Sequence, residues 1–598
     1  MLEPSDRHTL IDAMRPPAGH RFDEAMAVTF TLDLRALLAA PAAFALAPVD
    51  ERDDDADGPE PIELIHAIRA HAGNITVFSE AGEIALPPAR KVFAFLERCV
   101  VPVTAPRHGV VHPKVWVLRY LPIEDDGAPV HRVLIASRNL TFDTSWDTLL
   151  RLDQASSPRG ADLGPIADLF DTLVAQAVGP VGDDHRARVA SLGRALREVR
   201  FALPLGVESL RMHVMGAGGV DRPLPADPDR TLVVSPFLSA DFFTSVHPHP
   251  IEVLVSRSES IDGLPVEVAG SIAQASVIDD DLAATDTEAD ADLTPADPGN
   301  RLEGLHAKIF LTETGSRARL FVGSANASGA AFGQNLEVLA ELEGPVSSLG
   351  IDRLLHGDGD QVGLGAILLP YRRSEHPAEL SDDGSPPDGL RRAIGRLGIA
   401  GVVDPSATGW AIRYRSEHPV PVPDGVELTC WPIASAGNRL RVPGGHPLDL
   451  RFEVTLETIS GFVGFEAIEV DTGLCTRFAV PAVLEGVPDD RERLLLRSLI
   501  GSAERFLRYL LALLDDESTG EAALDTIADI EGSGDRRAAT GSLPVLEKLV
   551  RTVRRDPDKL LALDPLVRDL AADDALPDGF GAVWAVLRPR FGIEETAR

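Results

Sequence analysis

The sequence predicts an α/β protein built from two related halves, followed by an all-β module and an α-helical module. One observation is a partial repeat: residues 305–310 (LHAKIF) and 320–326 (LFVGSAN) have upstream counterparts at 111–116 (VHPKVW) and 133–139 (VLIASRN). Short β-favouring runs also alternate with helical runs before each copy, which indicates mostly buried sheets covered by helices. The 598 residues provide enough chain for several domains with buried cores.

The first predicted half covers residues 1–155, and residues 156–230 join it to the second. In the first half we expect an apolar helix after the opening strand, a helix over 92–99, and strands at 28–32, 75–78 and 100–103. The connecting segment has amphipathic patterns at 166–178 and 186–199, and these predict a helical insertion.

The second predicted half covers residues 231–375 and repeats the same series. We expect strands at 232–237, 251–255 and 275–278, a short element at 240–246, and a closing helix at 346–355. Alternating segments such as 410–415 and 449–454 predict a β-rich accessory domain over 376–487. Residues 488–598 are expected to be helical, with 491–514 as the clearest amphipathic segment. This C-terminal third has no identifiable chemistry, so we expect it to serve binding or assembly.

Composition indicates a cytoplasmic protein. The N-terminus lacks a basic region with an apolar signal core, and the cysteines Cys99, Cys430 and Cys475 have no disulfide pattern. The net charge of −35 opposes nucleic-acid binding through charge alone, because such affinity comes from clustered cations. Residues 51–57 and 279–297 hold much of the acid and are interpreted as solvated linkers. A DNA substrate would therefore need a local arginine-lined channel or a partner.

The repeated motif brings together groups suited to phosphate chemistry. Of the 57 basic residues only five are lysines, and two of those, Lys114 and Lys308, stand in His-x-Lys. Arginine differs from lysine in shape and hydration, so this choice indicates a tight phosphate site. Side chains at i and i+2 on a strand share one face. Two neighbouring strands would thus present imidazole, ammonium, hydroxyl and amide groups to one patch, forming a phosphate pocket with a nucleophile or an acid.

These residues resemble the phospholipase D superfamily, whose HKD motif combines His-x-Lys, a following Asp and Gly-Ser-x-Asn. The second copy fits closely, with Glu313 at the place of the Asp and Gly323 before the serine. The first copy departs more, because Arg119 takes the place of the Asp, Ala136 replaces the Gly, and the hairpin is longer. The resemblance implies two α/β sandwich halves packed face to face, with both motifs at one central active-site cleft.

The resemblance also implies phosphodiester cleavage without a metal or cofactor, through a phosphohistidine. His112 would be the nucleophile and His306 the general acid, although the sequence itself does not order them. Asp147 and Glu337 would accept hydrogen bonds from the distal imidazole nitrogens and orient the rings. The groups expected to hold the phosphate are Lys114, Lys308, Ser137, Asn139, Ser324 and Asn326.

Three hypotheses for the function remain open on the sequence. The first is a nuclease acting on DNA in bacterial restriction or anti-phage defence, with a helicase or another defence subunit as partner. The second is a phospholipase or phosphatidyltransferase acting on lipid phosphodiesters, which an acidic surface opposes at an anionic bilayer. The third is a catalytically degenerate scaffold in a nucleic-acid-processing complex. Two histidine-lysine-asparagine sets argue against the scaffold, because a scaffold has no chemical need for them.

Overall fold

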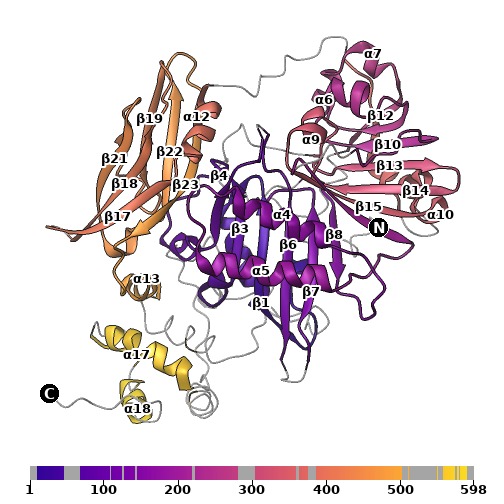
Figure 1. Cartoon of the computed structure of the whole chain (residues 1–598). Coiled ribbons are helices and arrows are strands. Elements are labelled where there is room, and N and C mark those ends of the chain that lie inside the picture. The colour runs from indigo at the N-terminus through magenta and orange to yellow at the C-terminus, as the bar shows by residue number, and fades with distance from the viewer. Residues whose placement is uncertain are drawn as a thin grey trace.

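The predicted mixed α/β class is confirmed by the computed structural model, which contains several sheets with helices packed against them (Figure 1). The structure describes residues 10–45, 68–107, 109–123, 127–141, 145–217, 222–279, 304–357, 362–374, 386–407, 409–500, 510, 549, 557–572, 576–577 and 580–588. The acidic tracts at 51–57 and 280–297 lie outside these ranges. Among the described residues, no helix combines the length and the apolar character needed to cross a membrane.

The first sheet has six strands, and its inner strand β1 separates parallel from antiparallel neighbours. β1 pairs in parallel with β3 and antiparallel with β6. In spatial order the strands are β5 (Val100–Val103), β3 (Ile75–Glu80), β1 (His20–Thr29), β6 (Val115–Pro122), β7 (Val130–Ala136) and β8 (Leu149–Asp153). The helical segments around it are α1 (Leu10–Met14), α2 (Leu34–Ala45), η3 (Ala72–Asn74), η4 (Lys91–Leu96), α4 (Gly164–Ala175) and α5 (Asp183–Glu198).

The second sheet has eight strands, six of which repeat the order and directions of the first. Three parallel strands are again followed by three antiparallel ones. In spatial order the strands are β16 (Leu368–Pro370), β12 (Ile272–Ile278), β11 (Ile251–Val255), β10 (Arg230–Val234), β13 (Ile309–Thr314), β14 (Arg317–Gly323), β15 (Glu337–Pro345) and β9 (Ser209–Met215). Its helical segments are η5 (Phe242–Val246), α6 (Ser258–Asp262), α7 (Val266–Ala269), α9 (Gly329–Gly333), α10 (Val346–Leu349), α11 (Ile351–His356) and η7 (Leu364–Ile367).

Side chains along β1 alternate between two hydrophobic clusters, as the pleat of a sheet requires. Ala25 and Ala27 pack in the cluster that includes α2, whereas Met26 and Val28 pack in the one that includes α4 and α5. The latter cluster also contains Val338 of β15. The first and second sheets therefore share one buried core, which includes β1 of the first sheet and β15 of the second.

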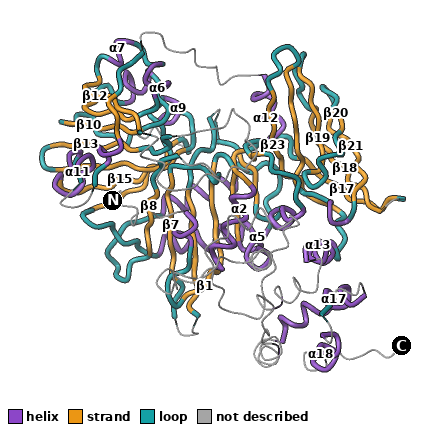
Figure 2. The backbone as a smooth tube through the Cα atoms, turned by 180° about the vertical axis from the view of Figure 1, so that it is seen from behind, coloured by secondary structure: helices purple, strands orange, loops and turns teal. Residues whose placement is uncertain are grey.

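The third sheet lies beside the first (Figures 1 and 2) and includes two short strands from the first half of the chain. The short strand β4 (Ile84–Ala85) pairs antiparallel with β23 and in parallel with β2 (Leu32–Asp33). The other strands are β20 (Leu440–Arg441), β19 (Val426–Pro432), β22 (Phe462–Glu469), β23 (Cys475–Glu485), β17 (Ile399–Ser406), β18 (Gly409–Pro419) and β21 (Pro447–Val454). The helical segments beyond 385 are α12 (Pro386–Gly395), η8 (Leu456–Thr458), α13 (Arg491–Ile500), α17 (Pro557–Ala572) and α18 (Phe580–Leu587).

Some elements differ from the sequence expectation. The connecting segment 156–230 contains β9 as well as α4 and α5, and β9 forms an edge of the second sheet. Its alternating pattern, in which Leu210 and Met212 are buried, was a signal for a strand. The expected helix at 92–99 is the 3₁₀ segment η4. The amphipathic segment 491–514 forms α13 as far as Ile500, and most of the remainder lies outside the described residues.

Candidate active site

The two His-x-Lys segments occupy equivalent places in the first and second sheets. Lys114 immediately precedes β6, and Lys308 immediately precedes β13. Both strands pair antiparallel with the inner strand of their sheet. The spacing predicts that the motif residues lie within these strands, but they lie just before them. Each segment still presents a histidine and a lysine at the same end of its sheet.

The asparagine segments follow the adjacent strands and are fixed by one hydroxyl each. Asn139 follows β7, and Thr29 Oγ1 accepts the N–H of Leu140 at 3.0 Å and donates to Thr31 O at 2.8 Å. At the equivalent place, Ser235 Oγ accepts the N–H of Ala327 at 2.9 Å and donates to Phe237 O at 2.8 Å. The sequence analysis missed these two anchors, although a hydroxyl residue at the end of each inner strand was a readable signal.

Backbone contacts then join each histidine segment to the opposite sheet. The His112 N–H donates to Leu336 O at 2.9 Å, next to Glu337 of β15. The His306 N–H donates to Trp146 O at 2.7 Å, next to Asp147. In both cases the histidine segment of one sheet thus lies beside the acidic residue of the other sheet. The site consequently depends on the contact between the two sheets.

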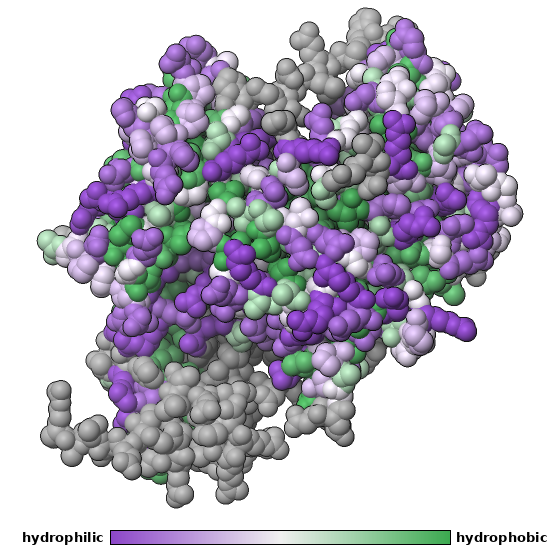
Figure 3. All heavy atoms as spheres, in the orientation of Figure 1, coloured by the Kyte–Doolittle hydropathy of each residue, from purple (hydrophilic) through white to green (hydrophobic). Residues whose placement is uncertain are grey.

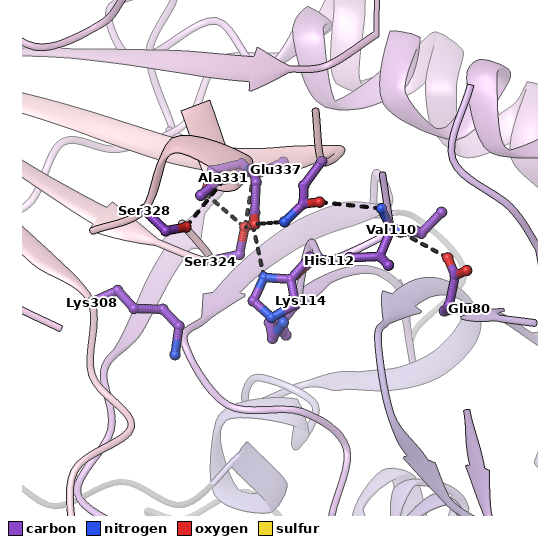
Figure 4. Close-up of polar contacts among 12 residues, drawn as sticks. Glu80, Val110, His112, Lys114, Lys308, Ser324, Ser328, Ala331 and Glu337 are labelled. Carbon is purple, nitrogen blue, oxygen red and sulfur yellow. Dashed lines mark hydrogen bonds and ion pairs between the residues drawn. The ribbon is translucent and has the colours of Figure 1, made fainter. Parts of the chain in front are cut away.

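Glu337 and His112 form the central hydrogen bond of the site (Figure 4). His112 Nδ1 lies 2.9 Å from Glu337 Oε2, and the same carboxylate accepts the Ser324 hydroxyl. The Asn335 side chain adds a bond of 3.4 Å to the other oxygen. Burial opposes ionisation of Glu337, but His112, Lys114 and Ser324 together hold its pKa below the usual range. A buried carboxylate therefore orients the His112 ring.

Asp147 has a different side-chain environment. Its carboxylate forms an ion pair with Arg138 Nε at 3.3 Å, and about a third of its side chain is exposed (31%). The backbone places it beside His306, as described above. The two acidic residues thus share a position but not an environment, because Glu337 is completely buried.

The two motif serines are engaged in internal hydrogen bonds. Ser324 donates to Glu337 and accepts the Val338 N–H at 3.0 Å. Ser137 Oγ accepts the Thr148 N–H at 2.8 Å. Both serines are buried. The structure therefore places them as supports of the segments that bear Glu337 and Asp147, whereas the resemblance implied contacts with phosphate.

The two lysines share one backbone contact, and Lys308 Nζ also lies 3.1 Å from His306 Nδ1. Lys114 Nζ donates to His112 O at 2.6 Å, and Lys308 Nζ donates to His306 O at 2.7 Å. Each ammonium is thereby tied to the peptide group of its own histidine, and both side chains are buried. Figure 4 shows Lys308 on one side of the site and Lys114 with His112 on the other. The pKa of Lys114 lies well below its usual value, mainly because of burial, with Glu337 opposing and Lys308 adding to the shift.

The two asparagines each carry a buried oxygen without a partner. Asn139 Oδ1 and Asn326 Oδ1 make no hydrogen bond within the part of the chain that the structure describes. Burying an unpaired polar atom is costly, so both amides are candidates for contact with a bound group. Because the same unpaired oxygen occurs in both sheets, a single local packing defect does not explain it.

The two imidazoles differ in their electrostatic surroundings. The pKa of His306 lies well below its usual value because of burial and then Lys308, Lys114, His112 and Arg257. Burial also lowers the pKa of His112, but Glu337 acts in the opposite direction. Cations therefore dominate the surroundings of His306, whereas His112 contacts an anion. The excess of positive groups suits a bound anion such as a phosphodiester.

Aromatic residues beside the histidines were also missed by the sequence analysis. The Phe30 ring lies 5.4 Å from the His112 ring, measured between centroids. Phe237 is 44% exposed, and the Arg257 guanidinium carbon lies 5.1 Å from its ring centroid. Arg257 also donates to Leu305 O at 2.8 Å, directly before His306. An exposed aromatic ring is thus fixed near the second histidine.

Comparisons with known proteins give structural similarity only. No protein-family model and no curated protein matches the sequence. A solved structure of polyphosphate kinase from Porphyromonas gingivalis is 14% identical with a TM-score of 0.28, and the match covers 56% of this chain and 42% of that chain. The yeast tyrosyl-DNA phosphodiesterase H432N_Glu mutant is 13% identical with a TM-score of 0.30, and the match covers 57% of this chain and 86% of that chain.

Proposed function

We propose that the chain is a metal-independent phosphodiesterase, and specifically a nuclease that cleaves DNA through a phosphohistidine. The observation that carries this proposal is the pairing of His112 with Glu337 across the two sheets at 2.9 Å. This hydrogen bond gives the proposed nucleophile, His112, a carboxylate partner from the sheet that carries the other histidine-lysine-asparagine set. We further assign residues 1–155 and 231–375 to two phospholipase D-like halves around this site, with 376–487 and 488–598 as accessory modules.

In the proposed reaction His112 attacks first. Glu337 accepts a hydrogen bond from Nδ1–H of His112, so the Nε2 lone pair is free to form a bond with phosphorus. The P–O bond to the leaving group breaks as His306 donates a proton to that oxygen. Water then attacks the phosphohistidine while His306 removes its proton, and the P–N bond breaks. Lys114, Lys308 and the two asparagine amides offset the charge that builds on the non-bridging oxygens.

The surroundings of the site favour a nucleic acid over a lipid. Phe237 offers an exposed ring on which a base can stack, and Arg257 adds a cation beside it. These groups supply the local affinity that the net charge of −35 does not. Restriction or anti-phage defence, with a helicase or another defence subunit that loads DNA, is the setting we propose for this activity.

The test is cleavage of single- and double-stranded DNA in EDTA, with bis-p-nitrophenyl phosphate as a generic phosphodiester. We expect the wild type to cleave in EDTA and His112→Ala and His306→Ala to be inactive. Cleavage of only the generic ester would favour a lipid substrate or a missing partner. If the wild type cleaves neither DNA nor the ester nor the lipid of phosphatidylcholine vesicles, the proposal is overturned and a scaffold is favoured.

A further inference from the structure

Glu80 ends β3 and binds the backbone N–H of Val111, the residue before His112. Its Oε2 accepts the Val111 N–H at 2.8 Å, and the carboxylate is completely buried. Val111 also forms a bridge with Leu336, which precedes Glu337. The Glu80 carboxylate therefore fixes the segment that brings His112 to its acidic partner (Figure 4).

The register of the second sheet places Arg257 at the position equivalent to Glu80. Thr29 pairs with Ser79 in the first sheet, and Ser256 contacts Ser235 in the second, with Ser256 Oγ donating to Ser235 O at 2.6 Å. The following residues are Glu80 and Arg257. Glu80 binds the N–H of the residue before His112, whereas Arg257 binds the carbonyl of the residue before His306. Equivalent positions thus carry opposite charges that contact equivalent residues, Glu80 through the N–H of Val111 and Arg257 through the carbonyl of Leu305.

Helix α12 connects Glu80 to the third sheet. One face of α12 packs Leu390 and Ile394 into the hydrophobic core of that sheet. Arg391 of α12 lies 2.9 Å from Glu83, and Arg396, directly after the helix, lies 4.0 Å from Glu80 Oε1. The helix therefore belongs to the third sheet, called the accessory sheet below. The helix and the residue after it direct cations to the end of β3 and to the turn that follows it.

The contact between α12 and this turn is close at the backbone level. A Cβ added to Gly395 would lie 2.3 Å from the Gly82 nitrogen, so only glycine permits the approach. The neighbouring β4 pairs with β23 of the same accessory sheet. A displacement of the accessory sheet would consequently move the cations away from Glu80.

The charge of Glu80 is finely balanced in this position. Burial raises its pKa to about 7, while the Val111 N–H, Arg396 and Arg392 favour the ionised form and Glu83 opposes it. Glu80 Oε1 has no hydrogen-bond partner within the described ranges. An ionised carboxylate is a stronger acceptor for the Val111 N–H than a neutral carboxyl group. Small changes in the arginine contacts will therefore alter the hold on the His112 segment.

We propose that Glu80 is a positioning residue for His112 and that docked α12 maintains it, so the accessory sheet controls cleavage at the site. This inference rests on the proposed function of His112. Docking of α12 keeps Glu80 ionised and His112 aligned with Glu337. Displacement of α12 by a bound partner loosens the Val111 contact and lowers activity.

The test measures kcat and KM for bis-p-nitrophenyl phosphate across pH, since a small ester excludes effects of DNA capture. The variants are Glu80→Gln, Arg396→Gln, their double mutant, and Arg413→Gln as a control within the accessory sheet, where Arg413 pairs with Asp449. At pH 8 we expect Glu80→Gln to lower kcat roughly tenfold with little change in KM, as misplacement of a reacting group does. The wild-type inflection near pH 7 should disappear in Glu80→Gln and move to higher pH in Arg396→Gln.

The double mutant decides whether Arg396 acts through Glu80. We expect Arg396→Gln to have no further effect in the Glu80→Gln background, and Arg413→Gln to behave as the wild type. Equal losses from Arg396→Gln in both backgrounds, or an unchanged pH profile in Glu80→Gln, would overturn the inference. Arg396 is half exposed, so we expect Arg396→Gln to fold even if the buried substitution Glu80→Gln prevents folding.

An NMR measurement keeps this inference separate from the proposed function. In protein with 13C-labelled histidine rings, the His112 signal is assigned with His112→Ala and followed across pH. We expect a transition near pH 7 that is absent in Glu80→Gln, whether or not the wild type cleaves the ester. An identical His112 titration in both proteins would reject the role of Glu80. Absence of cleavage with the expected titration would reject only the phosphodiesterase proposal.

Discussion

At the residue scale, the two histidines are chemically different although their segments are related by a repeat. His112 contacts the buried carboxylate of Glu337, whereas the pKa of His306 is lowered by burial and then by cations that include Lys308 and Lys114. A histidine that shares its proton with a carboxylate suits attack on phosphorus. A histidine among cations gains a proton most readily when an anion has entered.

This difference predicts separate pH profiles for kcat/KM and kcat. In the free enzyme the pKa of His306 lies well below 6.5, and kcat/KM reports the free enzyme. In its proposed role as the general acid, His306 must be protonated, so kcat/KM should fall as pH rises through its lowered pKa. A bound phosphodiester offsets the lysine charges and raises the pKa of His306, so kcat should persist to higher pH. Coincident profiles would contradict this assignment.

The environments of the two acidic residues predict unequal effects of their removal. Glu337→Gln should lower kcat by about 10³- to 10⁴-fold, because the amide no longer fixes the tautomer of His112. Asp147→Asn should have a smaller effect, since its carboxylate pairs with Arg138 and is 31% exposed. Single-turnover rates on bis-p-nitrophenyl phosphate measure both changes. A greater loss in Asp147→Asn would indicate that His306 is the nucleophile and His112 the general acid.

At the scale of elements, the inner strands β1 and β10 determine where the asparagines lie. Thr29 and Ser235 each end or follow an inner strand and bind the N–H after an asparagine, at 3.0 and 2.9 Å. In each sheet, the hydroxyl therefore links the inner strand to the segment that follows β7 or β14, the second strand away from it. This coupling occurs in both sheets, in the segment that carries the motif asparagine.

Removing an anchor should reduce both stability and activity. Ser235→Ala leaves the Ala327 N–H buried without an acceptor, at an expected cost of about 1–3 kcal/mol, and loosens Asn326. Thr312→Val is the matched control, because the buried Thr312 hydroxyl has no hydrogen-bond partner among the residues described. Urea unfolding and kcat together measure the effect. A Ser235→Ala protein as stable and active as Thr312→Val would refute the anchoring role.

At the scale of the whole molecule, a buried ion pair fastens the third sheet to the first. Arg491 of α13 lies 2.7 Å from Glu97, and both side chains are about nine-tenths buried (11% and 10% exposed). Glu97 also accepts the Gly461 N–H at 2.6 Å, and Arg491 donates to Ile459 O at 2.6 Å. The pair thus connects three parts of the chain far apart in sequence. On the face seen in Figure 3, by contrast, hydrophilic residues are prominent at the surface.

Breaking this pair should separate the unfolding of the accessory sheet from that of the first sheet. Arg491→Gln leaves the Glu97 carboxylate buried without its cation, which typically costs about 3–5 kcal/mol. We expect an earlier urea transition, and lower kcat if the accessory sheet controls the site. Arg451→Gln is the control, since it removes an exposed pair with Glu453 that contributes under about 1 kcal/mol. Identical unfolding of both variants would exclude the fastening role.

The sequence by itself determined the mixed α/β class, the six histidine, lysine and asparagine positions, and the acidic position 337, because these follow from local periodicity and a repeated spacing. It did not determine that Glu337 binds His112 from the opposite sheet, or that Ser324 supports Glu337. It also missed Arg257, Glu80 and the two hydroxyl anchors. Each of these contacts joins segments distant along the chain, so no local pattern encodes it. Only the packing of one sheet against another decided which charged groups meet, and therefore why His112 and His306 have different surroundings.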